Sequence, residues 1–422
     1  MVVTGRPFPA RRRAPVAPVA HLLAAIAFAL PATAATWVVD VGGTGDFTAI
    51  QPALTAASED DIVLVLPGTY TGADNRNLSF GTKNLVLRSR DGAATTIIDC
   101  QNTSGTRGIV FYNGGQDTTC VVDGFTIKRA RLTEAGASGA GIRVEGLTTP
   151  PSPLLVNLIV RDNNNIASNG GGLYCNNGVA PVVRNVVFQN NHAQSGGGMY
   201  CNNNCAPHLS GVTFVENDAV TRGGGAYCGQ GCDAWFMDVL FEENEAGDNG
   251  AGLACWKSSP ALLRCVFVDN EATDYAGAMD FQTNCSPHIA SCTLVGNGAP
   301  AGGAIYATGA SYPTLTQSIV AFHGAGSSTF HCDGTSLPTV AYSVVFGNAA
   351  GDSLCGDHHD NAFVDPLFCN VLTGDLTLAS DSPCLPGNPG NPADALVGAL
   401  GQGCEDSPVE PSSWGRIKCL FR

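Results

Sequence analysis

The sequence has 422 residues, of which 52 are glycine and only 14 % are charged, and its formal net charge is −15. This composition is too apolar for an intrinsically disordered chain, and the glycines lack the three-residue period of collagen. The acidic balance argues against binding to nucleic acid or to an anionic membrane surface. An anionic polymer such as pectate would also need a bridging cation.

Residues 1–34 have the pattern of a secretory signal peptide. A basic segment ends at residues 11–13, an apolar core runs from Leu22 to Leu30, and small residues follow where a signal peptidase would cut. The core is too short to span a membrane, and no other stretch predicts a transmembrane segment. We therefore expect an exported protein that is extracellular or associated with an outer membrane, with the periplasm as an alternative.

Residues 35–83 predict a small cap that combines strands with one helix. Apolar strands are expected at 37–41 and 62–66, and Ile50, Leu54 and Ala57 between them have helical spacing. We expect this helix to cover the open end of the fold that follows, because a bare end would expose core and unpaired backbone groups.

Residues 84–385 are expected to form the main body of the fold, and a repeat of 26 or 27 residues organises its central part, residues 170–306. One phrase joins glycines to an apolar residue, a tyrosine and a cysteine, as in Gly170–Cys175, Gly196–Cys201 and Gly223–Cys228. It continues in weaker form to residue 306. A second phrase runs in phase with the first and places asparagine three positions after a large apolar residue: Phe188…Asn191, Phe214…Asn217, Phe241…Asn244, Phe267…Asn270 and Leu294…Asn297. Self-similarity at such a period indicates a solenoid, a propeller or an array.

The repeat length selects one of these architectures. Glycine triplets exclude a helical repeat, and 26 residues are too few for a propeller blade. They suit one coil of a β-helix, in which three short strands pair in parallel with the same strands of the next coil. We therefore predict an all-β fold, a right-handed parallel β-helix (solenoid) of about 10–12 coils with an N-terminal helical cap. Residues 386–422 would form the C-terminal closure, a linker and a short basic-aromatic tail.

Stacked coils place residues one period apart in ladders. The phenylalanines of the second phrase should point inward, together with the residues two positions before them. The asparagines should stack in a turn, where asparagine tolerates left-handed backbone geometry and its amide can bond to the coils on both sides.

The two phrases, for example Gly302–Tyr306 and Phe214–Asn217, resemble the repeats of the polymorphic outer membrane proteins. More broadly, they resemble secreted bacterial right-handed β-helices of the pectin-lyase-like superfamily, and the segment from Gly45 to Tyr70 is similar to the opening of many of them, pectinesterases included. The resemblance implies the fold but no single activity, since the superfamily contains lyases, hydrolases, esterases, adhesins and stalks. Unlike the polymorphic outer membrane proteins, this chain shows no series of amphipathic strands for an autotransporter barrel.

The sequence has no complete catalytic motif of these enzymes. Arg416-Ile417-Lys418 matches a polygalacturonase motif in letters, but it lies in the tail without the paired aspartates. The densest polar cluster is Asp357, His358, His359 and Asp360, which would suit a metal site or a general base. The alternative is a solvated loop between late coils.

Three acids, Glu216, Glu243 and Asp269, each precede a ladder asparagine. Carboxylates about 5 Å apart in a stack would suit calcium. The alternative is a solvated acidic stripe. No other cofactor is expected.

The sequence has 17 cysteines, and disulfides are expected in an exported chain. Two arrangements stay open, namely local closure of Cys-x-x-x-Cys pairs and pairing between coils along a ladder that includes Cys175 and Cys255. Cys419 is the candidate for the thiol left over by the odd number. The candidate bridging cysteines are Cys201, Cys205, Cys228, Cys232, Cys265, Cys292, Cys369 and Cys384.

Four tyrosines of the first phrase, Tyr174, Tyr200, Tyr227 and Tyr306, should point away from the core. Such a stripe would stack on sugar rings or on a partner, or else serve ordinary cross-strand packing. We therefore expect a monomeric, non-catalytic, adhesin-like protein that presents an extended surface to an extracellular glycan or cell-surface partner. The alternatives are a polysaccharide-active enzyme (lyase, esterase or hydrolase) and a structural envelope or stalk protein.

Overall fold

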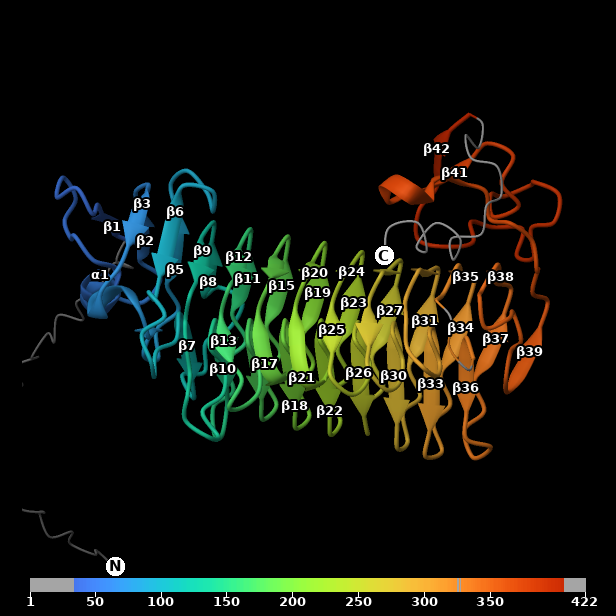
Figure 1. The fold of residues 1–422 in the computed structure, drawn as a ribbon. Helices are drawn as coiled ribbons and strands as arrows, with labels where there is room; N and C mark the ends of the chain where they lie inside the picture. Colours follow the sequence, from blue (N-terminus) through green and yellow to red (C-terminus); the bar gives the residue numbers. More distant parts are fainter. Residues whose placement is uncertain (1–33, 325, 327, 406–422) are drawn as a thin grey trace, which may run out of the picture. The chain divides into compact units, whose positions relative to one another are not determined.

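The structure is a computed structural model that describes residues 34–324, 326 and 328–405. The expected signal peptide lies outside the described residues except for residue 34. So do Arg416-Ile417-Lys418, Cys419 and the rest of the tail from residue 406. Within the described part, short strands pair in parallel from one coil to the next, and Figure 1 follows them in sequence order from β1 to β39.

Four parallel sheets run along the coils, and we name them A, B, C and D. Sheet A has 13 strands; two of them lie in the expected cap, and the other 11 agree with the 10–12 coils predicted. Its strands are β1 (Thr36–Val39), β2 (Ile62–Val65), β5 (Val86–Ser89), β8 (Val121–Asp123), β11 (Leu154–Val156), β15 (Val182–Arg184), β19 (His208–Ser210), β23 (Trp235–Met237), β27 (Ala261–Leu263), β31 (His288–Ala290), β34 (Thr314–Thr316), β37 (Thr339–Ala341) and β39 (Asp357–His359).

Sheets B and C complete the wall of each coil, and sheet D adds a short fourth side to the central coils. Sheet B contains β3 (Gly68–Tyr70), β6 (Thr96–Asp99), β9 (Thr126–Lys128), β12 (Ile159–Arg161), β16 (Val187–Gln189), β20 (Thr213–Val215), β24 (Leu240–Glu242), β28 (Val266–Val268), β32 (Thr293–Val295), β35 (Ile319–Ala321) and β38 (Val344–Phe346). Sheet C contains β4 (Leu78–Ser79), β7 (Ile109–Tyr112), β10 (Ile142–Glu145), β14 (Leu173–Asn176), β18 (Met199–Asn202), β22 (Ala226–Gly229), β26 (Leu253–Trp256), β30 (Met279–Gln282), β33 (Ile305–Thr308) and β36 (Phe330–Cys332). Sheet D contains β13 (Asn164–Asn165), β17 (His192–Ser195), β21 (Asp218–Arg222), β25 (Glu245–Ala246) and β29 (Glu271–Ala272). The all-β parallel solenoid predicted from the repeat is thus confirmed.

The apolar ladders form the core, as the repeat predicted. Phe188, Phe214, Phe241 and Phe267 are fully buried. Their rings stack from coil to coil with centroid separations of 5.1, 5.0 and 4.4 Å. Each buried ring removes a large apolar area from water, so the column stabilises the contact between every pair of adjacent coils.

The asparagine ladder is confirmed, with one correction to its backbone geometry. Each ladder asparagine before the last donates from its side chain to the side-chain oxygen of the next, as Asn217 does to Asn244 at 3.0 Å. The left-handed conformation, however, falls one residue earlier, at Glu216, Glu243 and Asp269, whose φ values are 54°, 49° and 52°. The preceding residue turns the chain so that the amide can enter the stack, which explains why the asparagine itself keeps ordinary geometry.

The glycines of the first phrase have two separate physical causes. Gly196 and Gly223 have φ values of 65° and 69°, which glycine adopts without strain. Gly198 has no such requirement, but a Cβ there would lie 2.5 Å from the Gly225 carbonyl oxygen and 2.6 Å from the Phe214 ring. Adjacent coils therefore approach too closely at this corner for any side chain.

The predicted N-terminal helix is α1 (Ile50–Ala56), and it buries Ile50, Ala53 and Leu54 in the main core. A short 3₁₀ turn, η1 (Ala73–Asn75), lies next to it, and the Asn75 side chain accepts from the Ile50 N–H at 2.8 Å. The parallel sheets run across the expected boundary at residue 84, because β2 pairs with both β1 and β5.

The C-terminal segment, residues 366–405, returns onto the outward face of sheet B. It forms a small separate sheet of β40 (Phe368–Asn370), β41 (Asp375–Ala379) and β42 (Gln402–Cys404), with the 3₁₀ turn η2 (Val371–Thr373). Its apolar side chains pack against Val295 and Ile319 of the coils. The Ala399 N–H donates to the Thr293 hydroxyl at 2.9 Å. Closure thus begins about twenty residues before the expected position at 386.

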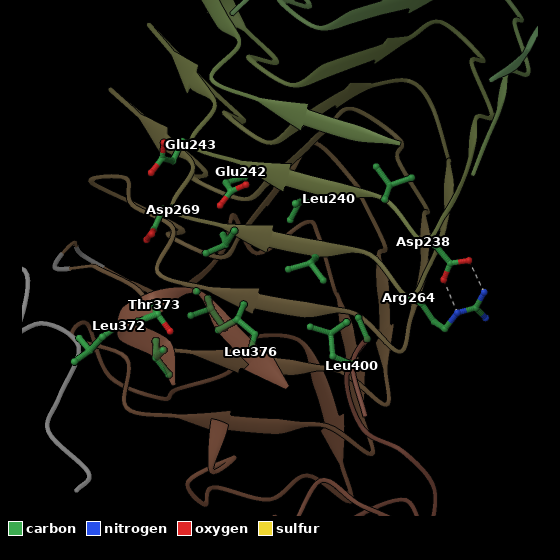
Figure 2. A pocket seen from close by; sticks show the side chains of 17 residues that line it. Asp238, Leu240, Glu242, Glu243, Arg264, Asp269, Leu372, Thr373, Leu376 and Leu400 are labelled. Atoms are coloured by element: carbon green, nitrogen blue, oxygen red, sulfur yellow. Dashed lines mark hydrogen bonds and ion pairs between the residues drawn. The ribbon is translucent and has the colours of Figure 1, made fainter. Parts of the chain in front are cut away.

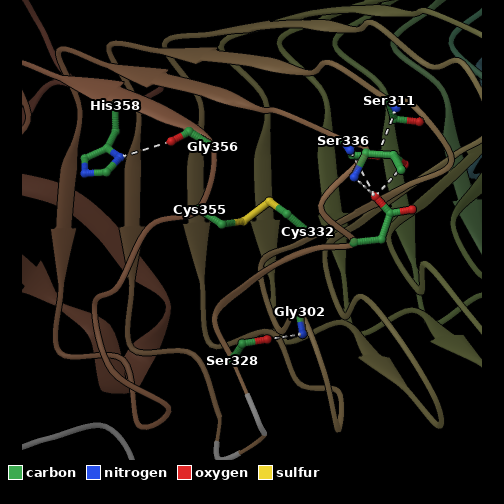
Figure 3. The surroundings of a disulfide bond; sticks show 10 residues. Gly302, Ser311, Ser328, Cys332, Ser336, Cys355, Gly356 and His358 are labelled. Atoms are coloured by element: carbon green, nitrogen blue, oxygen red, sulfur yellow. Dashed lines mark hydrogen bonds between the residues drawn. A yellow bond between two sulfur atoms is a disulfide. The ribbon is translucent and has the colours of Figure 1, made fainter.

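Among the described residues, three disulfides join Cys201 to Cys232, Cys332 to Cys355 and Cys369 to Cys404 (Figure 3 shows the second). Neither expected pairing scheme occurs among the described cysteines. Among the candidates, Cys205, Cys228, Cys265, Cys292 and Cys384 are buried free thiols.

Two of the free thiols, Cys205 and Cys292, fill positions that serine fills in other coils. Cys205 donates to the carbonyl of Asn202, three residues earlier, and Ser311 makes the equivalent bond to Thr308 at 2.8 Å. Cys292 donates to the Ala290 carbonyl at 3.3 Å, as serine does one coil later. Cys205 and Cys292 therefore close turns through their own backbone. Free thiols also contact one another between coils, since Cys265 lies in hydrogen-bond contact with Cys292 and Cys228 with Cys255.

Replacing Cys332 and Cys355 by serine should lower the free energy of unfolding by about 3 kcal/mol, because the bond restricts a loop of this size in the unfolded chain. Urea unfolding under non-reducing conditions would measure the change. Cys205→Ser is the matched control and should have little effect, since serine already closes the same turn at Ser311. Equal stability of the disulfide variant and the wild type would contradict the assignment.

Candidate functional site

The tyrosine stripe lies on the outward face of sheet C, but its rings cover one another. Tyr174 and Tyr200 stack at 5.6 Å, and Tyr200 and Tyr227 at 4.9 Å. Burial raises the pKa of Tyr174 to about 12, and burial also raises the pKa of Tyr227. Tyr306 belongs to a second stack, between Tyr275 at 4.6 Å and a histidine ring at 4.4 Å. Neighbouring rings thus cover both faces of Tyr200 and of Tyr306. Ligand binding by the tyrosine stripe stays a prediction.

The acids Glu216, Glu243 and Asp269 lie in the left-handed turns between sheets B and D. The side chain of Gln189 donates to Glu216 at 3.1 Å. No group of three or more histidines, cysteines or acids within the described residues is arranged to hold a metal ion. Calcium binding by this stripe stays a prediction.

Glu243 and Asp269 lie at a cavity of about 540 Å³ between sheet B and the returning C-terminal segment (Figure 2). We call it the B-face cleft. Outward side chains of sheet B and side chains of the C-terminal segment form its apolar part, and three carboxylates form its acidic side. The apolar part consists of Leu240, Val266, Val268, Val295, Val371, Leu372, Leu376, Ala399 and Leu400, and the acidic side of Glu242, Glu243 and Asp269.

Several carboxylates lie close to one another in the B-face cleft. Burial, followed by the neighbouring charges of Glu243, Asp269 and Glu216, raises the pKa of Glu242. At the other end of the cleft, Arg264 donates to both oxygens of Asp238, at 2.6 and 2.8 Å. The single basic side chain among the described lining residues is thus already engaged, and the carboxylates set the charge of the cleft.

The cluster Asp357–Asp360 lies mostly in a strand, since β39 contains its first three residues and is the last strand of sheet A. All four side chains are exposed. His359 contacts Asp360 at 3.0 Å, and His358 lies 3.4 Å from the Gly356 carbonyl (Figure 3). These polar contacts are local in sequence. From the preceding coil, the Tyr342 ring meets the His359 ring edge-on, with centroids 5.6 Å apart. A metal-binding or general-base role of this cluster stays a prediction.

Trp235, which the repeat analysis did not single out, is the most accessible aromatic platform on sheet A. It is 44 % exposed on the outward face of β23. In its ladder, His208 precedes it and Ala261 and His288 follow, all from adjacent strands of sheet A. No aromatic ring within the described ranges stacks on its indole. One feature of the sequence could have identified Trp235. It occupies an outward position of the repeat, and histidine occupies the same position in two other coils.

Asp280 is a second residue that sequence analysis missed. It occupies the outward ladder position between Ala254 and Tyr306, which carries tyrosine in several other coils. The side chain is only 1 % exposed, and its Oδ1 finds no hydrogen-bond partner among the described residues. Burial raises the pKa of this carboxyl to about 7.

Comparison with known families agrees with the architecture. Residues 85–263 and 162–365 each match the family described as the right-handed β-helix region, and together they cover more than half of the chain. No curated protein sequence matches this chain. The described residues contain no helix that is both long and apolar enough to cross a membrane. The chain belongs to the right-handed β-helix family.

Proposed function

We propose that this protein is an exported, non-catalytic binding protein whose β-helix presents an extended surface for adhesion or glycan binding. Trp235 on the outward face of sheet A is the observation that carries this proposal. An exposed indole on a regular sheet offers an apolar face to the C–H face of a sugar ring. The exposed His208 and His288 lie in the same ladder and offer hydrogen-bonding groups on both sides.

The regular spacing of the ladder favours an extended ligand. Neighbouring strands lie about 4.8 Å apart, so three steps from His208 to His288 cover about 14 Å. A polymeric glycan can contact several coils of such a face, whereas a single sugar would contact one or two. The three disulfides support the exported location, since such bonds persist in oxidising compartments.

Replacing Trp235 by alanine should weaken glycan binding about thirtyfold, because loss of a central aromatic contact costs about 2 kcal/mol. A glycan array would first identify a ligand, and calorimetry would then compare the variant with the wild type. Trp256→Ala is the matched control, since this indole lies on sheet C under the Lys257 ammonium, 4.4 Å from its ring centre. Equal loss in both variants would contradict a specific role for Trp235.

A specific observation also favours the enzymatic alternative. Glu242 has a raised pKa beside two further carboxylates in the B-face cleft, and paired carboxyl groups of different pKa are what glycoside hydrolysis uses. A reducing-sugar assay on polysaccharides would distinguish the two functions. Product release that Glu242→Gln abolishes would replace the binding proposal by a hydrolase. The absence of both binding and release would favour a structural stalk.

A further inference from the structure

The outward face of sheet B changes character along the chain. In one ladder, Lys128, Arg161 and Gln189 occupy three successive coils. Val215, Glu242, Val268 and Val295 follow, so the last two of these positions are both valine. An outward sheet face normally carries polar side chains where it meets water. The valines therefore indicate a part of this outward face that another segment shields from water.

The C-terminal segment covers only part of this apolar face. Val295 and Ile319 are buried beneath it, whereas Leu240, Val266 and Val268 stay half-buried at the B-face cleft. Leu372 of η2, on the opposite wall, is 49 % exposed (Figure 2). The apolar surface thus extends beyond its cover on both sides of the cleft.

The negative charge of the B-face cleft indicates what kind of segment would bind there. Glu242, Glu243 and Asp269 lie together beside the apolar surface, and the charges of the other two help to raise the pKa of Glu242. A cation placed among them would relieve this repulsion. An occupant that suits the cleft therefore carries basic groups next to apolar ones.

A segment of this chain outside the described residues has this composition. Residues 412–422 contain three basic side chains, four large apolar ones and no acid: Arg416, Lys418 and Arg422, with Trp414, Ile417, Leu420 and Phe421. The last described residues lie near the cleft, because Cys404 is bonded to Cys369, and Val371, two residues beyond Cys369, lines the cavity. The ten residues from Cys404 to Trp414 span at most about 33 Å when fully extended, which is long enough for the tail to reach the cleft.

We propose that residues 412–422 bind in the B-face cleft of the same chain, with their basic side chains at the three carboxylates and their apolar side chains on the open sheet B surface. This site lies on a different sheet from Trp235, so it does not depend on the proposed glycan binding.

Photo-crosslinking in the full-length protein tests the proposal. Trp414 is replaced by p-benzoylphenylalanine, the intact mass confirms that the tail is present, and crosslinked peptides are identified by mass spectrometry. We expect crosslinks to β24, β28 or η2. A companion protein that also carries Glu242→Gln, Glu243→Gln and Asp269→Asn should lose at least tenfold in crosslink yield.

The matched control removes two acids from sheet D, Glu245→Gln and Glu271→Gln, and should keep the wild-type yield. An equal mixture of isotopically light and heavy protein identifies the source of the tail. Crosslinks within one isotope form support binding in the same chain, and mixed crosslinks overturn it in favour of a second copy. Crosslinks spread over other faces, or a yield unaffected by the three cleft substitutions, would also overturn the proposal.

Discussion

Replacing Asn244 by leucine should lower the free energy of unfolding by about 3–5 kcal/mol. The Asn244 side chain donates to the Phe214 carbonyl at 2.9 Å and to the Asn270 side chain at 2.8 Å. Its Oδ1 accepts from both the backbone and the side chain of Asn217, at 3.1 and 3.0 Å. Leucine has similar size but leaves all these buried partners unsatisfied, so the cost exceeds that of one hydrogen bond.

Urea unfolding would measure the total loss, and hydrogen exchange would show whether the coils around residue 244 open first. Asn202→Leu is the matched control, because Asn202 faces outward from sheet C and is half-buried. The control should cost less than about 1 kcal/mol. A loss at Asn244 no larger than that of the control would show that the ladder bonds contribute little.

Replacing Asp280 by asparagine should stabilise the protein by about 4 kcal/mol at pH 8 and have almost no effect below pH 4. Burial raises the pKa of this carboxyl from 3.8 to about 7, although Arg222 and a hydrogen bond from Gln282 act to lower it. The folded protein therefore keeps the proton to a higher pH than the unfolded chain. The wild type loses stability as the pH rises from 3.8 to about 7, and the neutral amide avoids this loss.

Denaturation midpoints measured between pH 3 and pH 9 would give the two curves. Asp333→Asn is a control of opposite sign, because the Gly309 N–H and the Thr335 side chain bond to that carboxylate and lower its pKa. Asparagine there should weaken the protein at neutral pH, and its difference from the wild type should shrink as the pH falls. Parallel curves for wild type and Asp280→Asn would contradict the raised pKa.

The exposure of the aromatic side chains at the candidate sites was not predictable from the repeat. The repeat correctly identified which residues face outward, but it did not show which ring faces stay accessible. Tyr200 and Trp235 both face outward, yet stacking covers the tyrosine while Ala261 in the next coil leaves the indole open. The exposure of an aromatic ring depends on the size of its neighbours in adjacent coils. One copy of the repeated motif therefore does not predict that exposure.

The sequence by itself determined the coil, because a period of 26 or 27 residues repeats one local geometry and ladders follow from stacking. The buried phenylalanines and asparagines were predictable for that reason. Only the tertiary structure decided the B-face cleft, whose walls come from segments about a hundred residues apart, such as Val266 and Leu372. It also decided the Cys201–Cys232 bond, because side-chain direction within a turn, and not spacing along the chain, selects which thiols meet.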